Sequence, residues 1–460
     1  MISKKKLAAS LILGTLLSGC GGRGNAPVSV VPPAPAVPFA SSPAGIIKHV
    51  VIIVQENRSF ENMFAGWPGA DAPLFGYEHN GNKVPLHQMT FQNDCYYVNG
   101  FQGCDLGHLW RQAITSWNNG HMNGFDLTGL GTLGSGPPAG TYPYAYMDHA
   151  EIAPYRALAS QYVLADHMFP TEFGTSFTAH QDLIAGTTQV RTNPNQSLVN
   201  VPLPGPPWGC EAGPGETTVL VNEQRVLSNN GPFPCFTYKT MADTLDAAHV
   251  SWKYYAPSVN FFAGSVWSAF ASIDKVYHGP DWTRSVISPE TIALTDPAKG
   301  RLPGVSWIIP DVNWSDHPVS TSDQGPSWVG DLVNAIGKSR YWNSTAIVLL
   351  WDDWGGWYDN AAPKQLDYVG LGLRVPCVII SPYALKGHVV HTQYEFGSIL
   401  KFIEETFNLS SLGATDVRAT SLDDSFDFTQ TPRKFVPIKT KYSARFFIMQ
   451  PQSRQAPDND

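Results

Sequence analysis

A polar cluster follows an apolar, strand-like run near the start of the chain. Residues 50–54 are apolar and β-branched, a pattern that predicts a buried parallel strand. The run is followed at once by Gln55, Glu56, Asn57 and Arg58. Ligand sites in open α/β sheets lie just beyond the carboxyl ends of the strands. A carboxylate, a carboxamide and a guanidinium at such a place suit a metal ion and a phosphoryl group; the alternative is an ordinary strand that ends in a polar loop.

A second transition of the same kind lies far downstream. The apolar run 346–351 leads directly into Asp352 and Asp353, and Gly355-Gly356 follows them. Adjacent carboxylates repel each other, so such a pair is unfavourable unless a cation or solvent neutralises it. The flanking aromatic residues argue against full solvation and therefore favour a metal site over a solvated acidic loop. The two glycines allow the backbone to turn sharply and approach a ligand closely.

A hydroxyl-bearing turn separates these two clusters in the sequence. Gly174, Thr175 and Ser176 precede residues 179–185, which we predict to be helical, with Gly186 as the stop signal. A hydroxyl at a helix N-terminus has backbone N–H groups and the positive end of the helix dipole beside it, which would favour a phosphoryl oxygen. Serine and threonine are also ordinary N-caps, so this turn alone indicates little.

In this order, the three segments resemble the bacterial phosphoesterase family that contains phosphatidylcholine-type phospholipases C and respiratory-burst-inhibiting acid phosphatases. That family resembles a branch of the alkaline phosphatase/sulfatase superfamily. The similarity spans residues 46–412, and its motifs are residues 55–60, 174–176, 185–187, 310–318, 351–359, 381–387, 391–394 and 398–402. It implies an α/β protein with an alkaline phosphatase-like α/β/α sandwich, a mainly parallel central sheet and long loop insertions.

The resemblance also implies a set of site residues. One divalent metal ion, which the sequence does not identify, would be held by Glu56, Asn57, Ser176, Asp352 and Asp353. Ser176 occupies the nucleophile position, and Thr175 is the alternative because many relatives have a threonine as nucleophile. His108 and His317 fall where the family places histidines that face the phosphoryl group.

Two departures from the family pattern concern this site. Relatives usually carry Pro-Asn-Arg after the nucleophile, whereas this chain has His180 at the end of the corresponding triplet. We therefore expect His180, together with Asn57, to contact the substrate. Many relatives also read Asp-His-Val where this chain has residues 359–361, Asp-Asn-Ala. The missing histidine at Asn360 weakens the case for a second metal ion but leaves the first unaffected.

The resemblance implies a metal-dependent hydrolase of phosphoric esters, of the phospholipase C or acid phosphatase type, and the residue types fit that chemistry. Its substrate would be a phosphate monoester, a phospholipid or another phosphodiester. A metal would activate the hydroxyl of Ser176 for attack on phosphorus and a phosphoserine would form, while His317 or His108 would protonate the leaving alcohol. The alternatives are another phosphodiesterase or phosphotransferase of the same superfamily, or a catalytically inactive surface lipoprotein that binds a ligand.

Alternating strand-like and helical segments indicate the fold class. Strand-like runs at 50–54, 305–309, 347–351 and 375–380 alternate with helical stretches such as 329–336 and 398–407, which favours a mixed or mainly parallel sheet covered by helices. We predict a phosphoesterase domain over 46–450 and a polar tail over 451–460. Residues 188–300 form a possible cap or substrate rim, although their aromatic pairs, such as Tyr254-Tyr255, are more typical of a core.

The N-terminus predicts export and lipid attachment. Residues 1–19 combine three lysines, a short apolar run and small residues before Cys20, as in a lipoprotein signal peptide, and the run is too short to span a membrane. Residues 20–45 would be a Pro/Gly-rich tether, which places the protein at the bacterial cell envelope, facing the periplasm or the cell surface. Cleavage would change the net charge from −8 to −11, so we expect no nucleic-acid partner.

Five cysteines remain after Cys20, and an oxidising compartment makes disulfides plausible. The parsimonious local pairs are Cys95–Cys104 and Cys210–Cys235. Cys377 lies within an apolar strand-like run, so we expect a buried free thiol there.

Overall fold

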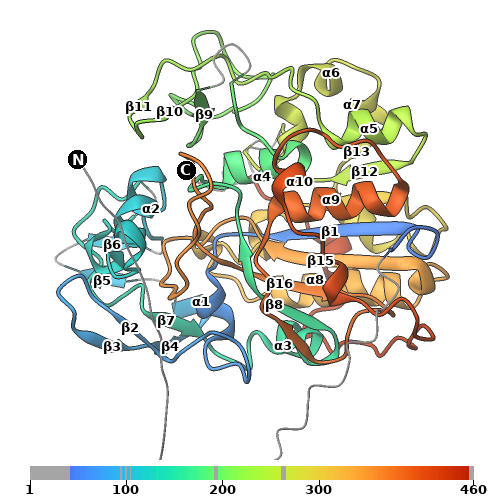
Figure 1. Ribbon diagram of the computed structural model, residues 1–460, viewed down its shortest axis with the longest axis horizontal. Helices are drawn as coiled ribbons and strands as arrows, with labels where there is room; N and C mark the ends of the chain where they lie inside the picture. The colour runs from blue at the N-terminus through green and yellow to red at the C-terminus, as the bar shows by residue number, and fades with distance from the viewer. Residues whose placement is uncertain are drawn as a thin grey trace, which may run out of the picture. The chain divides into compact units, whose positions relative to one another are not determined.

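A nine-stranded β-sheet runs through the middle of the protein in the computed structural model, which describes residues 42–93, 96–98, 101–103, 105–131, 133–190, 195–260 and 266–454 (Figure 1). Across the sheet the strands follow the order β13 (Val286–Ile287), β12 (Trp252–Tyr255), β14 (Val305–Ile308), β1 (His49–Gln55), β15 (Thr345–Trp351), β16 (Val375–Ile380), β8 (Val163–Phe169) and β17 (His388–Val390). The short β18 (Tyr394–Glu395) also pairs with β8.

Most neighbouring strands of this sheet are parallel. From β13 to β15 each pair is parallel, and β8 is parallel to β17 and β18. Strand β16 runs antiparallel to both of its neighbours, β15 and β8. The predicted α/β class with a mainly parallel central sheet is therefore confirmed.

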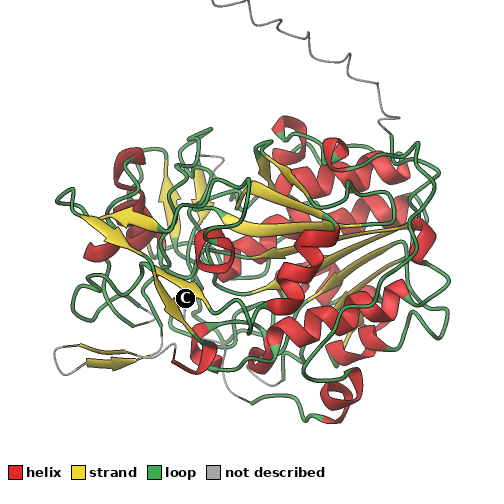
Figure 2. Cartoon of the chain, turned by 90° about the horizontal axis from the view of Figure 1, so that it is seen from below, coloured by secondary structure: helices red, strands yellow, loops and turns green. Residues whose placement is uncertain are grey.

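Helices cover both faces of the sheet (Figures 1 and 2). On one face α4 (Ser176–Ala185) packs against α9 (Phe396–Phe407), and on the other α3 (Ala153–Gln161) packs against α8 (Gly325–Gly337). The shorter helices are α1 (Phe60–Phe64), α2 (Trp110–Trp117), α5 (Met241–Ala247), α6 (Asp274–Tyr277), α7 (Asp281–Arg284), α10 (Thr415–Arg418) and α11 (Ala444–Met449). The helices predicted at 179–185, 329–336 and 398–407 correspond to α4, α8 and α9.

The two strands that carry the first and second polar clusters lie side by side near the centre of the sheet. β1 is buried from Val50 onward and β15 is buried throughout, because helices cover both faces. Burial on both faces explains why these strands read as continuous apolar runs and not as alternating patterns. The prediction of buried parallel strands at both places is confirmed.

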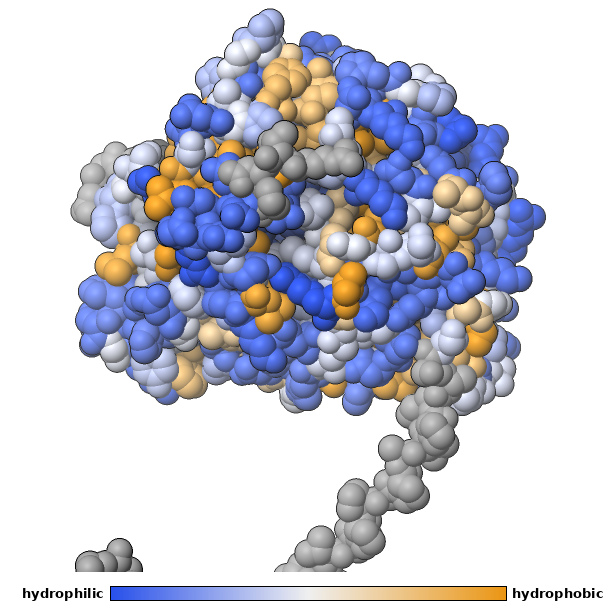
Figure 3. Space-filling view, turned by 45° about the horizontal axis from the view of Figure 1, so that its top comes forward, coloured by the Kyte–Doolittle hydropathy of each residue, from blue (hydrophilic) through white to orange (hydrophobic). Residues whose placement is uncertain are grey.

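Small sheets and loops surround the central sheet. Three two-stranded sheets pair β2 (Phe75–Tyr77) with β3 (Lys83–Pro85), β4 (His87–Met89) with β7 (Ala145–Met147), and β5 (Tyr96–Val98) with β6 (Phe101–Gly103). A three-stranded sheet contains β9 (Gln196–Leu198), β10 (Leu220–Asn222) and β11 (Leu227–Ser228). The face drawn in Figure 3 is mostly hydrophilic, with hydrophobic residues in separate patches.

The region 188–300 contributes both to these surroundings and to the central sheet. Its β9–β11 sheet is separate, whereas β12 and β13 are strands of the central sheet. Tyr254 and Tyr255 are each 1% exposed, so this aromatic pair belongs to the core. The predicted disulfide between Cys210 and Cys235 is present, and Cys377 is a buried free thiol as expected.

Several predictions concern residues outside the described part of the chain. These are the signal segment 1–19, the lipidation site Cys20, most of the tether and the pair Cys95–Cys104. Among the residues that the structure describes, no helix has the length and apolar character needed to cross a membrane.

Candidate active site

The pairing of β1 with β15 brings the two polar clusters to one edge of the sheet. Gln55 lies opposite Trp351 in the parallel register, so the residues after each strand emerge together. The backbone N–H of Asn57 donates to Oδ1 of Asp352 at 2.9 Å. Two segments almost 300 residues apart in the sequence are thus hydrogen-bonded at the site.

Close backbone approach fixes the position of Asn57. Asn57 has a φ of 58°, a left-handed conformation that asparagine tolerates better than most residues. Gly355, with a φ of 59°, packs so tightly against it that a Cβ atom would lie 2.1 Å from the Asn57 carbonyl oxygen. The N–H of Gly355 also donates to Oδ1 of Asp353 at 2.7 Å. Glycine is therefore required at position 355, as the expected sharp turn implied.

Helix α4 presents Ser176 to this edge from its first turn. Thr175 is the N-cap and Gly186, with a φ of 63°, ends the helix in the left-handed conformation. The Ser176 hydroxyl donates to Oδ2 of Asp353 at 3.4 Å. The Thr175 hydroxyl is also buried and has no hydrogen-bond partner among the described residues. Of the two candidate nucleophiles, Ser176 is the one hydrogen-bonded to the acidic pair.

His180 lies one helical turn after Ser176 and contacts the acidic residues instead of open space. Its Nε2 lies 3.1 Å from Oε1 of Glu56 and 4.0 Å from Oδ2 of Asp352. Burial lowers the pKa of His180 to about 4, although the Asp352 carboxylate acts in the opposite direction. The imidazole is therefore neutral near pH 7.

Glu56, His180 and Asp352 have ligand atoms within 4.8 Å of one another and could hold a metal ion. The sequence predicted the carboxylates of this group but gave His180 a different role, in substrate binding. The sequence did carry a signal that His180 could join the metal group: it lies four residues after Ser176, and residues four apart share one face of a helix.

Buried oxygen atoms at this edge fit a divalent cation. Oδ2 of Asp352 and Oδ1 of Asn57 are fully buried and have no hydrogen-bond partner within the described ranges. Buried polar groups without partners are unfavourable, and a carboxylate more so, unless a cation satisfies them. Oxygen donors with one imidazole suit a hard or borderline divalent metal.

The two predicted histidines are both buried beside this group, with ring centroids 6.3 Å apart. His108 Nδ1 lies 2.7 Å from the Leu106 carbonyl oxygen, and its Nε2 lies 2.7 Å from Nδ2 of Asn57. A carbonyl oxygen can only accept, so the proton of His108 is on Nδ1 and its Nε2 accepts from Asn57. His317 Nδ1 instead accepts from the N–H of Val319 at 3.2 Å, which places its proton on Nε2. The two histidines are therefore opposite tautomers.

The residues at the second departure from the family pattern make other contacts. Asp359 Oδ1 accepts from Nε of Arg374 at 2.9 Å, and Asn360 Oδ1 accepts from Nη2 of the same guanidinium at 2.8 Å. Asn360 also donates to Asp71 at 2.7 Å. The position that lacks the family histidine thus belongs to an arginine-centred network.

Comparison with known proteins identifies the family of this chain. The model of the Phosphoesterase family matches residues 47–410. "Phospholipase C A" of Mycobacterium tuberculosis is 25% identical over 442 residues, which cover 85% of this chain and 79% of that protein. "Non-specific phospholipase C6" of Arabidopsis thaliana is 30% identical over 437 residues, covering 85% and 74%.

A solved structure of a protein in the alkaline phosphatase superfamily from Vibrio parahaemolyticus is 12% identical, with a TM-score of 0.36 over 84% of this chain and 73% of that chain. The family match spans the strands, the turn of Ser176 and the acidic pair, and the chain belongs to the Phosphoesterase family, as a phosphoric ester hydrolase.

Proposed function

We propose that this hydrolase is a metal-dependent phospholipase C-type enzyme that acts through a phosphoserine at Ser176. The observation that carries the proposal is the hydrogen bond from the Ser176 hydroxyl to Asp353, at the N-terminus of α4 and beside the cluster of Glu56, His180 and Asp352. The similarity of the chain to phospholipases C of Mycobacterium tuberculosis and Arabidopsis thaliana supports a phospholipid substrate.

The metal ion would be held by the predicted oxygen ligands Glu56, Asn57, Ser176, Asp352 and Asp353. His180 is a further candidate ligand. When bound, it would supply positive charge that favours the alkoxide form of serine and stabilises negative charge on the phosphoryl oxygens.

The chain's own groups provide the positioning and the proton transfers. The Ser176 oxygen attacks phosphorus and its proton passes to Oδ2 of Asp353, the acceptor that it already contacts. The first N–H groups of α4 and the positive end of its dipole favour the phosphoryl oxygens. As the bond to the leaving oxygen breaks, that oxygen needs a proton.

His317 is better placed than His108 to donate a hydrogen bond to the leaving oxygen. The proton of His108 is used in its hydrogen bond to the Leu106 carbonyl, and its other nitrogen holds Asn57. His317 carries its proton on Nε2, because Nδ1 accepts from the backbone. We therefore assign His317 as the donor of an Nε2–H hydrogen bond to the departing oxygen, which takes its proton from water, and His108 as a positioning residue for Asn57. Water would then hydrolyse the phosphoserine.

The test compares three substrates in the purified full chain: p-nitrophenyl phosphate, bis-p-nitrophenyl phosphate and phosphatidylcholine, each with and without a chelator. Ser176→Ala should lower kcat/KM on the order of 10⁴-fold or more, as expected for loss of a nucleophile. Thr175→Ala is the matched control, since it removes the neighbouring buried hydroxyl and leaves Ser176 in place.

Each arm of this test has a defined meaning. Chelator-sensitive hydrolysis of phosphatidylcholine that Ser176→Ala abolishes and Thr175→Ala retains supports the proposal. Preference for p-nitrophenyl phosphate would instead identify a phosphatase. If Thr175→Ala is inactive and Ser176→Ala is active, the nucleophile is Thr175. Activity that resists exhaustive chelation would contradict metal dependence.

The cellular location is a separate part of the proposal. The lipobox-like sequence before Cys20 supports attachment of a lipid and residence at the bacterial cell envelope. Cys20→Ser should move the protein from the membrane fraction to the soluble fraction. Unchanged membrane association in that variant would refute lipid anchoring at this residue.

A further inference from the structure

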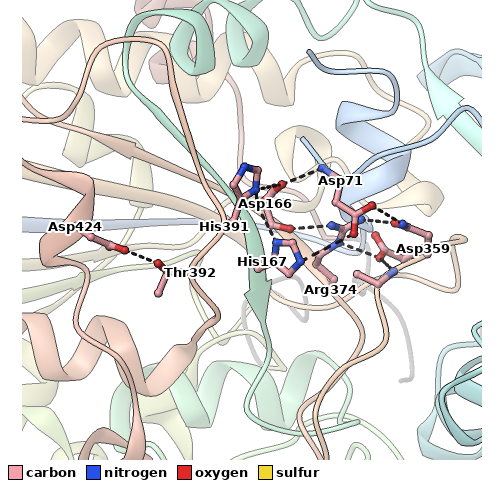
Figure 4. Close-up of polar contacts among 10 residues, drawn as sticks. Asp71, Asp166, His167, Asp359, Arg374, His391, Thr392 and Asp424 are labelled. Carbon is pink, nitrogen blue, oxygen red and sulfur yellow. Dashed lines mark hydrogen bonds and ion pairs between the residues drawn. The ribbon is translucent and has the colours of Figure 1, made fainter. Parts of the chain in front are cut away.

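A second group of possible metal ligands lies outside the candidate active site (Figure 4). Asp166 on β8 is fully buried, and its carboxylate faces two imidazoles. Nδ1 of His167 lies 2.7 Å from Oδ1 of Asp166. Nδ1 of His391 lies 3.0 Å and 2.9 Å from the two carboxylate oxygens. The group shares no residue with the cluster of Glu56, His180 and Asp352.

The spacing of these atoms is close to that around a bound transition-metal ion. Zinc–nitrogen and zinc–oxygen bonds of about 2.0–2.1 Å in a tetrahedron place neighbouring ligand atoms about 3.4 Å apart. The three ligand atoms here lie within 4.8 Å of one another, and the Asp–His separations are a few tenths of an ångström below the tetrahedral value. The His391 side chain is 60% exposed, so its ring has room to make the small adjustment.

A further carboxylate is placed to orient one of the ligands. Nε2 of His167, the nitrogen that faces away from Asp166, lies 4.0 Å from Oδ2 of Asp71. Asp71 is itself held by a hydrogen bond from Asn360 at 2.7 Å, and its N–H donates to Oδ2 of Asp166 at 2.9 Å. Metal-bound histidines commonly donate their second N–H to a carboxylate, and a shift of the His167 ring by about 1 Å would bring Nε2 within hydrogen-bond distance of Asp71.

The local charge balance leaves Asp166 available to a cation. The nearby Arg374 donates through Nε to the Asp359 carboxylate at 2.9 Å, so this cation already has a buried counter-charge. Its Nη1 donates to the backbone oxygen of Asp166, and not to the carboxylate. Among the described residues, the Asp166 carboxylate accepts from the two imidazoles and one backbone N–H.

We infer that Asp166, His167 and His391 form a structural site for a borderline divalent cation of the zinc class. Two imidazoles and one carboxylate suit zinc better than magnesium or calcium, and solvent would complete the coordination on the exposed side. The ion would join β8 to the segment between β17 and β18, two parts of the chain 225 residues apart. It would also fix the loop that carries Asp71.

The test is a metal count on the full chain. The protein is stripped with a chelator and titrated with Zn²⁺ by calorimetry, and with Co²⁺ followed by its visible absorption. His391→Ala should bind one equivalent fewer than the unmodified chain, whatever the occupancy of the active site. Asp71→Asn should weaken the binding of Zn²⁺ at this site by about 10–100-fold, as for other groups that orient a metal-bound histidine. His388→Ala is the control, because His388 is also exposed and lies three residues away on β17.

Two further variants keep the result interpretable. His391→Gln retains a group that can hydrogen-bond to Asp166, but it should still bind one Zn²⁺ ion fewer. This variant separates metal coordination from a hydrogen bond between residues 391 and 166. Asp352→Asn, in the active site, should leave this equivalent in place. Equal metal counts in the unmodified chain and in both His391 variants would overturn the inference, as would loss of the equivalent in His388→Ala.

Discussion

Glu290, which is fully buried, should make the stability of the protein fall as the pH rises. It is fully buried at the start of the 3₁₀ helix Glu290–Leu294. Burial, reinforced by the nearby Asp311 carboxylate, raises its pKa from the ordinary 4.5 to about 8. Between these two values the folded protein keeps a proton on Glu290 that the unfolded chain has lost.

The sign and size of the effect follow from proton linkage. Because the folded state binds more protons, this group lowers the free energy of unfolding by about 1.4 kcal/mol for each pH unit between 4.5 and 8, or about 5 kcal/mol in total. Below pH 4.5 both states are protonated and the contribution vanishes. Glu290→Gln removes the titration while it keeps the shape of the side chain, so its stability should exceed that of the unmodified protein by more at pH 8 than at pH 5.

Urea unfolding followed by circular dichroism from pH 5 to pH 8.5 measures this difference. Glu223→Gln is the control, since it makes the same substitution at an exposed position. If the free energies of unfolding of the unmodified protein and Glu290→Gln run parallel across this range, the reasoning is refuted.

Three other substitutions test the site and the fold. Gly355→Ala would place a Cβ atom 2.1 Å from the Asn57 carbonyl oxygen. The resulting displacement of Asn57 by about 1 Å should lower kcat/KM about 10²-fold in the esterase assay. Activity equal to that of the unmodified protein would contradict the proposed role of Asn57. Replacing Cys210 and Cys235 with alanine opens a loop of 25 residues. The free energy of unfolding in urea titrations should fall by about 3.5 kcal/mol. An unchanged free energy of unfolding would show that the disulfide does not restrict the unfolded chain. Leu349→Ala in the buried β15 should cost about 2–5 kcal/mol, against less than about 0.5 kcal/mol for Leu366→Ala at a site that is 46% exposed; equal costs would contradict the placement of β15 in the core.

The strands and the acidic edge were predictable because their signals are local. Burial on both faces imposes a continuous apolar run, and β1 and β15 each carry one that ends in polar residues. Parallel strands end at the same edge, so the meeting of Asn57 with Asp352 followed from that rule. Helix α4 was also recognisable, since Gly186 ends it in the left-handed conformation.

Other parts of the structure depend on contacts that no local pattern encodes. The role of His180 is set by Glu56, which lies 124 residues away in sequence and comes close only in the folded sheet. β12 and β13 fall in a region of mixed composition, and their place at the edge of the sheet is set by pairing of β12 with β14 and of β13 with β12. The proximity of Asp166 to His391 depends on the pairing of β8 with β17, and their sequence separation of 225 residues leaves no motif.

The central position of β1 has a consequence for the timing of biosynthesis. Its two neighbours in the sheet, β14 and β15, are translated about 250 and 300 residues later. At about 5–20 residues per second, the ribosome needs about 15–60 s to complete β15 after β1 has been made. For about the first 250 of those residues neither edge of this apolar strand has its partner, which is a condition that favours aggregation. We therefore expect the nascent chain to fold better with a chaperone or holding factor until residue 351 has emerged, and the acidic pair that follows becomes part of the site only at that late stage.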